Sequence, residues 1–76
     1  MKKFNLSIII PTWNRKKKLL KLIKIILIKL KKANINYEIH ICDSYSSDDT
    51  QLALVKLYKN NKKIFVHNIE FNSISE

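Results

Sequence analysis

The 76-residue sequence contains no glycine and only one proline, one cysteine and one tryptophan. A single cysteine excludes an internal disulfide and fits a reducing cytoplasm. No uninterrupted apolar run exceeds four residues, as in 25–28, so no membrane-spanning helix is expected. The opening Met1-Lys2-Lys3 is followed by neither an apolar core nor a small-residue cleavage site. We therefore expect no secretory signal peptide and a cytoplasmic location.

Acidic residues are missing where the basic residues gather. Residues 15–32 hold nine of the 15 Lys and Arg residues and no acid, while the remaining six basic and six acidic residues cancel. The whole net charge of +9 therefore belongs to this segment. Three interpretations stay open: a solvated helix face, attachment to an anionic membrane at its inner face, and phosphate contacts with nucleic acid. Nucleic acid is disfavoured, because neither a recognition motif nor interleaved aromatic residues accompany the charge.

The first half of the chain predicts a strand, a turn and a helix. Three β-branched residues in succession, 8–10, indicate a strand over 5–10 that is covered on both faces. Pro11 is expected to end it, because proline has no N–H for a sheet ladder. A helix is expected over about 16–32, with an apolar stripe of Leu19, Leu20, Leu22, Ile23, Ile26, Leu27 and Leu30. Ile25 and Ile28 fall among the lysines instead, and Asn34 or Asn36 is expected to end the helix in place of glycine.

The second half continues the alternation of strands and helices. A strand over 37–42 and a turn over 43–47 are expected to lead into a helix capped by Ser46 or Ser47, with Asp48 and Asp49 in its first turn. That helix is expected to reach about residue 60 and to bury Leu52 and Val55, with Leu54 and Tyr58 as further candidates. A third strand follows over 64–67. This β-α-β-α-β order predicts one small α/β domain with right-handed crossovers and a parallel sheet in the order 3-2-1.

Two motifs are more specific than the order of the elements. Residues 7–15 read Ser-Ile-Ile-Ile-Pro-Thr-Trp-Asn-Arg, and residues 41–50 read Ile-Cys-Asp-Ser-Tyr-Ser-Ser-Asp-Asp-Thr. Both closely resemble successive motifs of the inverting family 2 glycosyltransferases. The resemblance implies the Rossmann-like half of a GT-A nucleotide-diphospho-sugar transferase fold, with 1–76 as the nucleotide-binding amino-terminal part. It also implies a nucleotide-sugar donor, expected to be a UDP-sugar, and inverting transfer to an acceptor hydroxyl.

By this resemblance the nucleotide site comprises Pro11, Thr12, Trp13, Asn14, Arg15, Asp43 and Ser44. Asp43 is expected to accept a ring N–H of the base, with capping of its own turn as the alternative. Trp13 is expected either to lie over the base or ribose or to pack under the turn. Arg15 is expected to approach the diphosphate or to be a solvated residue of the helix start. Tyr45 stands where the family usually has glycine, and a bulky residue at positive φ is costly.

The catalytic part of the family pattern is not found in this sequence. It has no Asp-x-Asp motif to hold the Mn²⁺ or Mg²⁺ implied for the family, and no identifiable general base. No catalytic or metal-binding residue is assigned, and the chain alone is expected to transfer no sugar. His40, Cys42 and His67 make a poor zinc signature, and we expect them to pack under helices.

Two alternatives from other classes stay open. One is a small non-catalytic βαβ binding module, although a receiver-like domain would place acids where Pro11-Thr12-Trp13 stands. The other is a basic peripheral-membrane fragment. In either case the uncovered edge of the first strand favours self-association.

Overall fold

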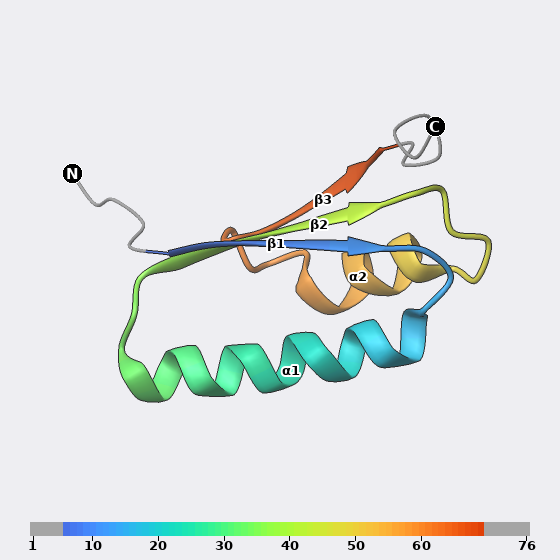
Figure 1. The fold of residues 1–76 in the computed structure, drawn as a ribbon. Helices are drawn as coiled ribbons and strands as arrows, with labels where there is room; N and C mark the ends of the chain where they lie inside the picture. The colour runs from blue at the N-terminus through green and yellow to red at the C-terminus, as the bar shows by residue number, and fades with distance from the viewer. Residues whose placement is uncertain (1–5, 70–76) are drawn as a thin grey trace.

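The computed structural model describes residues 6–69, and its elements follow the predicted order. They are β1 (Leu6–Thr12), α1 (Lys16–Ala33), β2 (Tyr37–Asp43), α2 (Thr50–Tyr58) and β3 (Ile64–Asn68). The strands are parallel and β2 lies between β1 and β3 (Figure 1). The predicted α/β fold with sheet order 3-2-1 is therefore confirmed. Asn5, the predicted start of the first strand, lies outside the described residues.

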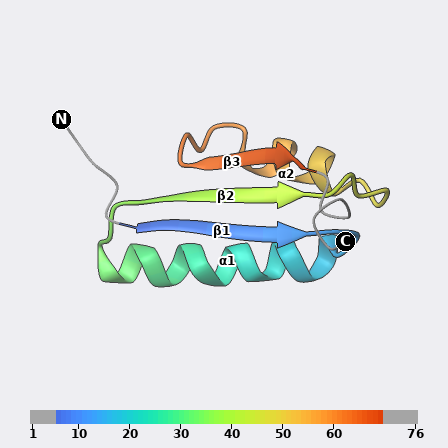
Figure 2. The same cartoon turned by 45° about the horizontal axis from the view of Figure 1, so that its top comes forward.

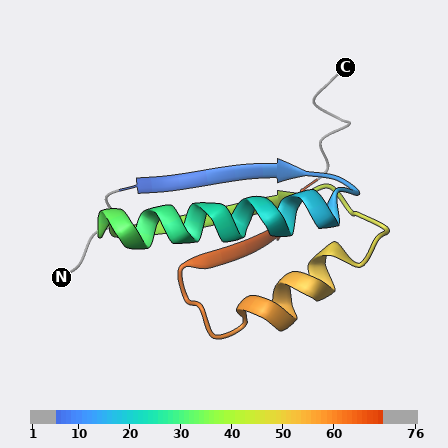
Figure 3. The same cartoon turned by 90° about the horizontal axis from the view of Figure 1, so that it is seen from below.

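Both helices lie on the same face of the sheet (Figure 1, Figure 3). Along β1, Ile10 is buried on the helix side, whereas the side chain of Ile9 is 68% exposed. The prediction that 8–10 would be covered on both faces is therefore wrong, because successive side chains of a strand point to opposite faces and only one face carries helices. The result is a two-layer arrangement with one open sheet face.

Pro11 lies inside β1 and does not end it. Its Cα is in register with Cys42 of β2, and the strand continues to Thr12. The prediction failed because β1 is an edge strand of the described sheet, and an edge strand needs ladder hydrogen bonds on one side only. Self-association through the free edge of β1 stays a prediction.

The core lies between the sheet and the two helices, with α1 along β1 and α2 on the side of β3 (Figure 2). It consists of Ile10, Leu19, Ile23, Leu30, Ile39, Ile41 and Leu54. The predicted stripe of α1 faces this core except for Leu22, which is exposed at the margin of the stripe. Asn34 ends α1 in the left-handed conformation at φ 56°, as predicted for a chain without glycine.

The start of α2 differs from the prediction. Neither Ser46 nor Ser47 caps it; Asp49 occupies the N-cap position at φ 61°, and no acid lies in the first turn. Leu54 and the half-buried Tyr58 face the core, but Leu52 and Val55 are exposed, so their predicted burial is wrong. Leu52 lies about 200° around the helix from Leu54, and a nine-residue helix on one sheet face buries only a narrow stripe.

This assignment predicts unequal effects of truncating two leucines of α2. Leu54 is 1% exposed and Leu52 is 55% exposed. We expect Leu54→Ala to lower the free energy of unfolding by about 2–4 kcal/mol through lost burial and a cavity. The matched variant Leu52→Ala is expected to change it by less than about 1 kcal/mol. Urea unfolding followed by circular dichroism measures both, and equal losses would contradict the observed packing of α2.

Candidate functional site

The turns that follow β1 and β2 meet at the carboxyl edge of the sheet. Thr12 and Asp43, the last residues of these strands, are in register. The backbone N–H of Ser44 donates to the carbonyl oxygen of Thr12 at 3.0 Å. The two sequence motifs, one in each turn, therefore come together as the paired motifs predicted.

Asn14 connects the two turns directly. Its backbone N–H donates to Ser46 Oγ at 2.8 Å, and its Oδ1 accepts from the Ser47 backbone N–H at 2.7 Å and from Ser47 Oγ at 3.3 Å. Asn14 adopts φ 49°, a conformation that asparagine tolerates better than most residues. Its observed contacts are with the second turn, and its part in a nucleotide site stays a prediction.

Asp43 is 0% exposed and holds the second turn from inside. Its Oδ2 accepts from the Ser46 backbone N–H at 3.1 Å and from Gln51 Nε2 at 3.0 Å, while Ser46 Oγ donates to its Oδ1. These contacts match the alternative in which Asp43 caps its turn. Its contact with a nucleobase stays a prediction, and that contact requires Ser46 and Gln51 to release the carboxylate.

Asp48 joins the start of α1 to the start of α2. Its Oδ2 accepts from the Lys16 backbone N–H at 3.0 Å, and its Oδ1 accepts from the Thr50 hydroxyl. The hydrogen bond from Thr50 is the main cause that holds the pKa of Asp48 below its usual value, with the Lys16 backbone assisting. This carboxylate therefore stays ionised at neutral pH beside the positive end of α1.

A pocket of about 550 Å³ opens beside the first turn and the start of α1. It is lined by Trp13, Asn14, Arg15, Lys16, Lys17, Lys18 and Asp48. The volume falls within the range of about 300–1,000 Å³ typical of small-molecule sites. Trp13 is 60% exposed, so the predicted packing of its ring under the turn is wrong. An accessible indole thus stands next to four basic side chains and a helix N-terminus.

The other predicted site residues are distributed around this pocket. Thr12 and Ser44 are buried and Pro11 is exposed, and none of the three lines the pocket. Tyr45 has φ 52°, so the tight turn forms here although a bulky residue at positive φ is costly. Its backbone N–H donates to Asn68 Oδ1 at 3.2 Å, and the Ile69 N–H donates to the Asp43 carbonyl at 2.9 Å. The end of β3 therefore supports the strained second turn.

Several contributors were not predicted from the sequence. Ser46 and Ser47 act as partners of Asn14 and Asp43, while Lys16–Lys18 supply most of the charge of the pocket. The run of lysines directly after Arg15 is the signal that could have pointed to the pocket, but nothing in the sequence distinguishes these lysines from the others of α1.

The described residues do not fit a Mn²⁺ or Mg²⁺ centre. Within 6–69 no three His, Cys, Asp or Glu side chains are grouped so that they could hold a metal ion. Asp43 and Asp48 already accept hydrogen bonds at both carboxylate oxygens. No catalytic step through a divalent ion is therefore derived for this chain.

Comparison with known protein families shows to which family the chain belongs. The sequence model of glycosyl transferase family 2 matches residues 7–73, which include both joined turns, β2, β3 and all of β1 except Leu6. The chain belongs to glycosyl transferase family 2. This membership confirms the resemblance seen in the two motifs and supports a glycosyltransferase-like function, and the family binds nucleotide-sugar donors in its full-length members. No curated protein matches the chain.

The hydrogen bonds of Asn14 predict that its replacement lowers the stability of the fold more than replacement of Asn34, which also has a positive φ. Asn14→Gly keeps the positive φ but removes the acceptor of two hydrogen bonds from Ser47, so we expect the free energy of unfolding to fall by about 1–2 kcal/mol. Asn34→Gly, at φ 56° on the C-cap of α1, is the matched control and should be neutral or stabilising. Urea unfolding and amide exchange at Ser47 report the effect. Indistinguishable behaviour of the two variants would show that Asn14 does not join the turns.

Proposed function

We propose that this chain binds the nucleoside diphosphate part of a nucleotide sugar in the pocket beside the joined turns, with a UDP-sugar as the expected donor. The observation that carries the proposal is the exposed indole of Trp13 next to Arg15 and the start of α1, around a pocket of about 550 Å³. Membership of glycosyl transferase family 2 supports the same ligand class.

The lining of the pocket divides into an aromatic part and a cationic part. The face of Trp13 offers a stacking surface for a base or ribose, an interaction worth about 1–3 kcal/mol per base. Arg15 and the neighbouring lysines offer charge-assisted hydrogen bonds to a diphosphate, whereas the first N–H of α1 is already donated to Asp48 at the rim of the pocket. Stacking on Trp13 suits the nucleoside, and the cationic side chains neutralise the diphosphate, so the pocket offers a partner to each half of a nucleoside diphosphate.

Recognition of the base edge is assigned to Thr12 and Asp43 in this proposal. Both are buried directly behind the turns, so they are reached only when the second turn opens. A carboxylate that accepts a ring N–H favours uracil over cytosine, because neutral cytosine lacks that N–H. Binding of the base is then coupled to release of Asp43 from Ser46 and Gln51.

The proposal covers donor binding and not transfer by this chain alone. Inverting transfer needs a base at the acceptor and neutralisation of the leaving diphosphate. The sequence has no Asp-x-Asp motif, and the carboxylates of Asp43 and Asp48 are engaged in the turns. Transfer to an acceptor hydroxyl therefore needs residues beyond those identified here.

Binding of UDP tests the proposal through two variants with the same change of charge. Arg15 lines the pocket, whereas Lys32 lies in the last turn of α1. We expect Arg15→Ala to weaken UDP binding about tenfold, the equivalent of roughly 1.4 kcal/mol. Trp13→Ala should weaken it at least as much. Lys32→Ala should change it less than about twofold, since only distant screened charge is lost.

Isothermal titration calorimetry at 0.15 M salt measures these affinities, with inorganic pyrophosphate as a second ligand that has no base. Trp13→Ala should affect UDP and leave pyrophosphate unchanged. Equal weakening by Arg15→Ala and Lys32→Ala would instead show nonspecific attraction of phosphate to α1, and the assignment of the pocket would be wrong.

The outer face of α1 supports a second candidate, attachment to an anionic membrane surface. Ile25 and Ile28 are 45% and 57% exposed among the lysines, as predicted. No helix of the described residues combines the length and apolarity needed to cross a bilayer. Two exposed isoleucines ringed by lysines instead suit shallow insertion beside acidic lipid headgroups.

Vesicle sedimentation tests this second candidate. We expect the chain to sediment with vesicles that contain phosphatidylserine and to stay in the supernatant with phosphatidylcholine alone. Ile28→Asp should reduce sedimentation several-fold more than Leu52→Asp, which makes the same charge change at a similarly exposed position of α2. Equal effects of the two variants would show that vesicle binding depends only on the net charge of the chain, and that α1 is not the attachment site.

A further inference from the structure

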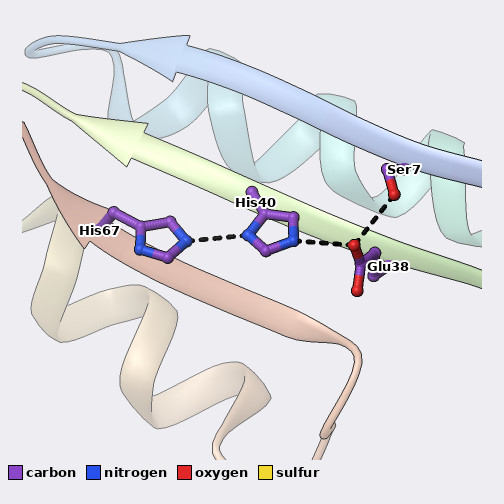
Figure 4. Close-up of polar contacts among 4 residues, drawn as sticks. All are labelled: Ser7, Glu38, His40 and His67. Atoms are coloured by element: carbon purple, nitrogen blue, oxygen red, sulfur yellow. Dashed lines mark hydrogen bonds and ion pairs between the residues drawn. The ribbon is translucent and has the colours of Figure 1, made fainter.

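The open face of the sheet carries both histidines of the sequence side by side. His40 lies on β2 and His67 on β3, and His40 Nδ1 is 2.9 Å from His67 Nε2 (Figure 4). Their rings are inclined by only 11° to each other. The prediction that these residues pack under helices is wrong, because they lie on the face opposite α1 and α2, where His67 is exposed. The pair is therefore accessible from solvent.

A chain of hydrogen bonds fixes which nitrogen of His40 is free. Ser7 Oγ donates to Glu38 Oε1 at 2.9 Å, and His40 Nε2 lies 3.2 Å from the same oxygen. Ser7 and His40 therefore both approach this oxygen with a donor, and Glu38 acts as a carboxylate that only accepts. His40 consequently carries its proton on Nε2, and its Nδ1 presents a lone pair toward His67.

We propose that His40 and His67 form a two-imidazole site for a divalent transition metal such as Zn²⁺, Ni²⁺ or Cu²⁺. A tetrahedral ion with bonds of about 2.0–2.1 Å holds two nitrogens about 3.3 Å apart. The observed separation is 2.9 Å and the two rings meet nearly head-on, so the exposed ring of His67 must turn and move outward before both nitrogens face one ion. His67 binds the ion through Nε2. The proton on that nitrogen moves to Nδ1 of the same ring, so metal binding releases no proton.

The surroundings of the pair match those of metal-binding imidazoles. A ligating histidine usually donates its other N–H to a carboxylate, which is the relation of His40 to Glu38. Phe65 stacks against His40 with ring centroids 4.8 Å apart and keeps its ring in place. Imidazole selects zinc, nickel and copper over magnesium, so this site is distinct in chemistry and in place from the diphosphate pocket. Water completes the coordination, and the metal links β2 to β3.

Titration with Zn²⁺ alone, followed by calorimetry, tests the site. The chain should bind one Zn²⁺ saturably, and Mg²⁺ should not compete. His67→Ala and His67→Asn should each weaken binding at least tenfold with unchanged circular dichroism. Glu38→Gln should weaken it about tenfold to a hundredfold, as expected for the partner of a ligating histidine. The ¹⁵N signals of His40 Nδ1 and His67 Nε2 should shift on Zn²⁺ addition.

Cys42→Ser is the matched control, because Cys42 is in register with His67 on the neighbouring strand. It should leave Zn²⁺ affinity within about twofold of the unchanged chain. Loss of binding in Cys42→Ser would make the thiol the ligand and overturn the proposal. Unchanged affinity in both His67 variants, or the absence of saturable Zn²⁺ binding, would overturn it as well.

Discussion

The hydrogen bonds between the turn after β1 and the turn after β2 are the constraint on which the site depends. The sequence has no glycine, so Asn14 and Tyr45 supply positive φ where glycine is usual. Ser46 donates hydrogen bonds to the carboxylate of Asp43, and Ser47 donates hydrogen bonds to the side-chain oxygen of Asn14. Since α1 begins directly after the first turn, this connection also sets where its first lysines and Trp13 stand. The pocket is therefore a consequence of how two tight turns are satisfied without glycine.

The one-sided arrangement of the helices separates three surfaces of different chemistry. The covered face carries the apolar core, and the outer face of α1 carries the lysines with Ile25 and Ile28. The open face of the sheet carries the polar chain that ends in the histidine pair. The proposed nucleotide pocket lies at the carboxyl edge, where parallel α/β sheets place their ligands. Each proposed interaction thus draws on a different part of a small fold.

The order of elements was predictable, because the 3.6-residue period of α1 and the two motifs are strong local signals. Which faces of the sheet the helices cover was not predictable, because a β-branched run such as 8–10 is compatible with one covered face or two. The burial of Leu54 and not Leu52 depends on the direction from which α2 meets the sheet, which is a tertiary property. Trp13 lies in the first turn as predicted, and Asp43, predicted to begin the second turn, is the last residue of β2. Their exposure followed from contacts with Ser46, Gln51 and the start of α1 that local patterns do not encode.

Trp13, the only tryptophan of the chain, allows the most direct test of nucleotide binding at the joined turns. Intermolecular nuclear Overhauser effects between its indole protons and the H5 and H6 protons of uridine diphosphate report contact within about 5 Å, the reach of aromatic stacking. The account predicts these signals in the complex, together with altered shifts at Asn14 and Arg15. Signals from the lysine methylenes of the middle and end of α1, with none from the indole, would contradict it.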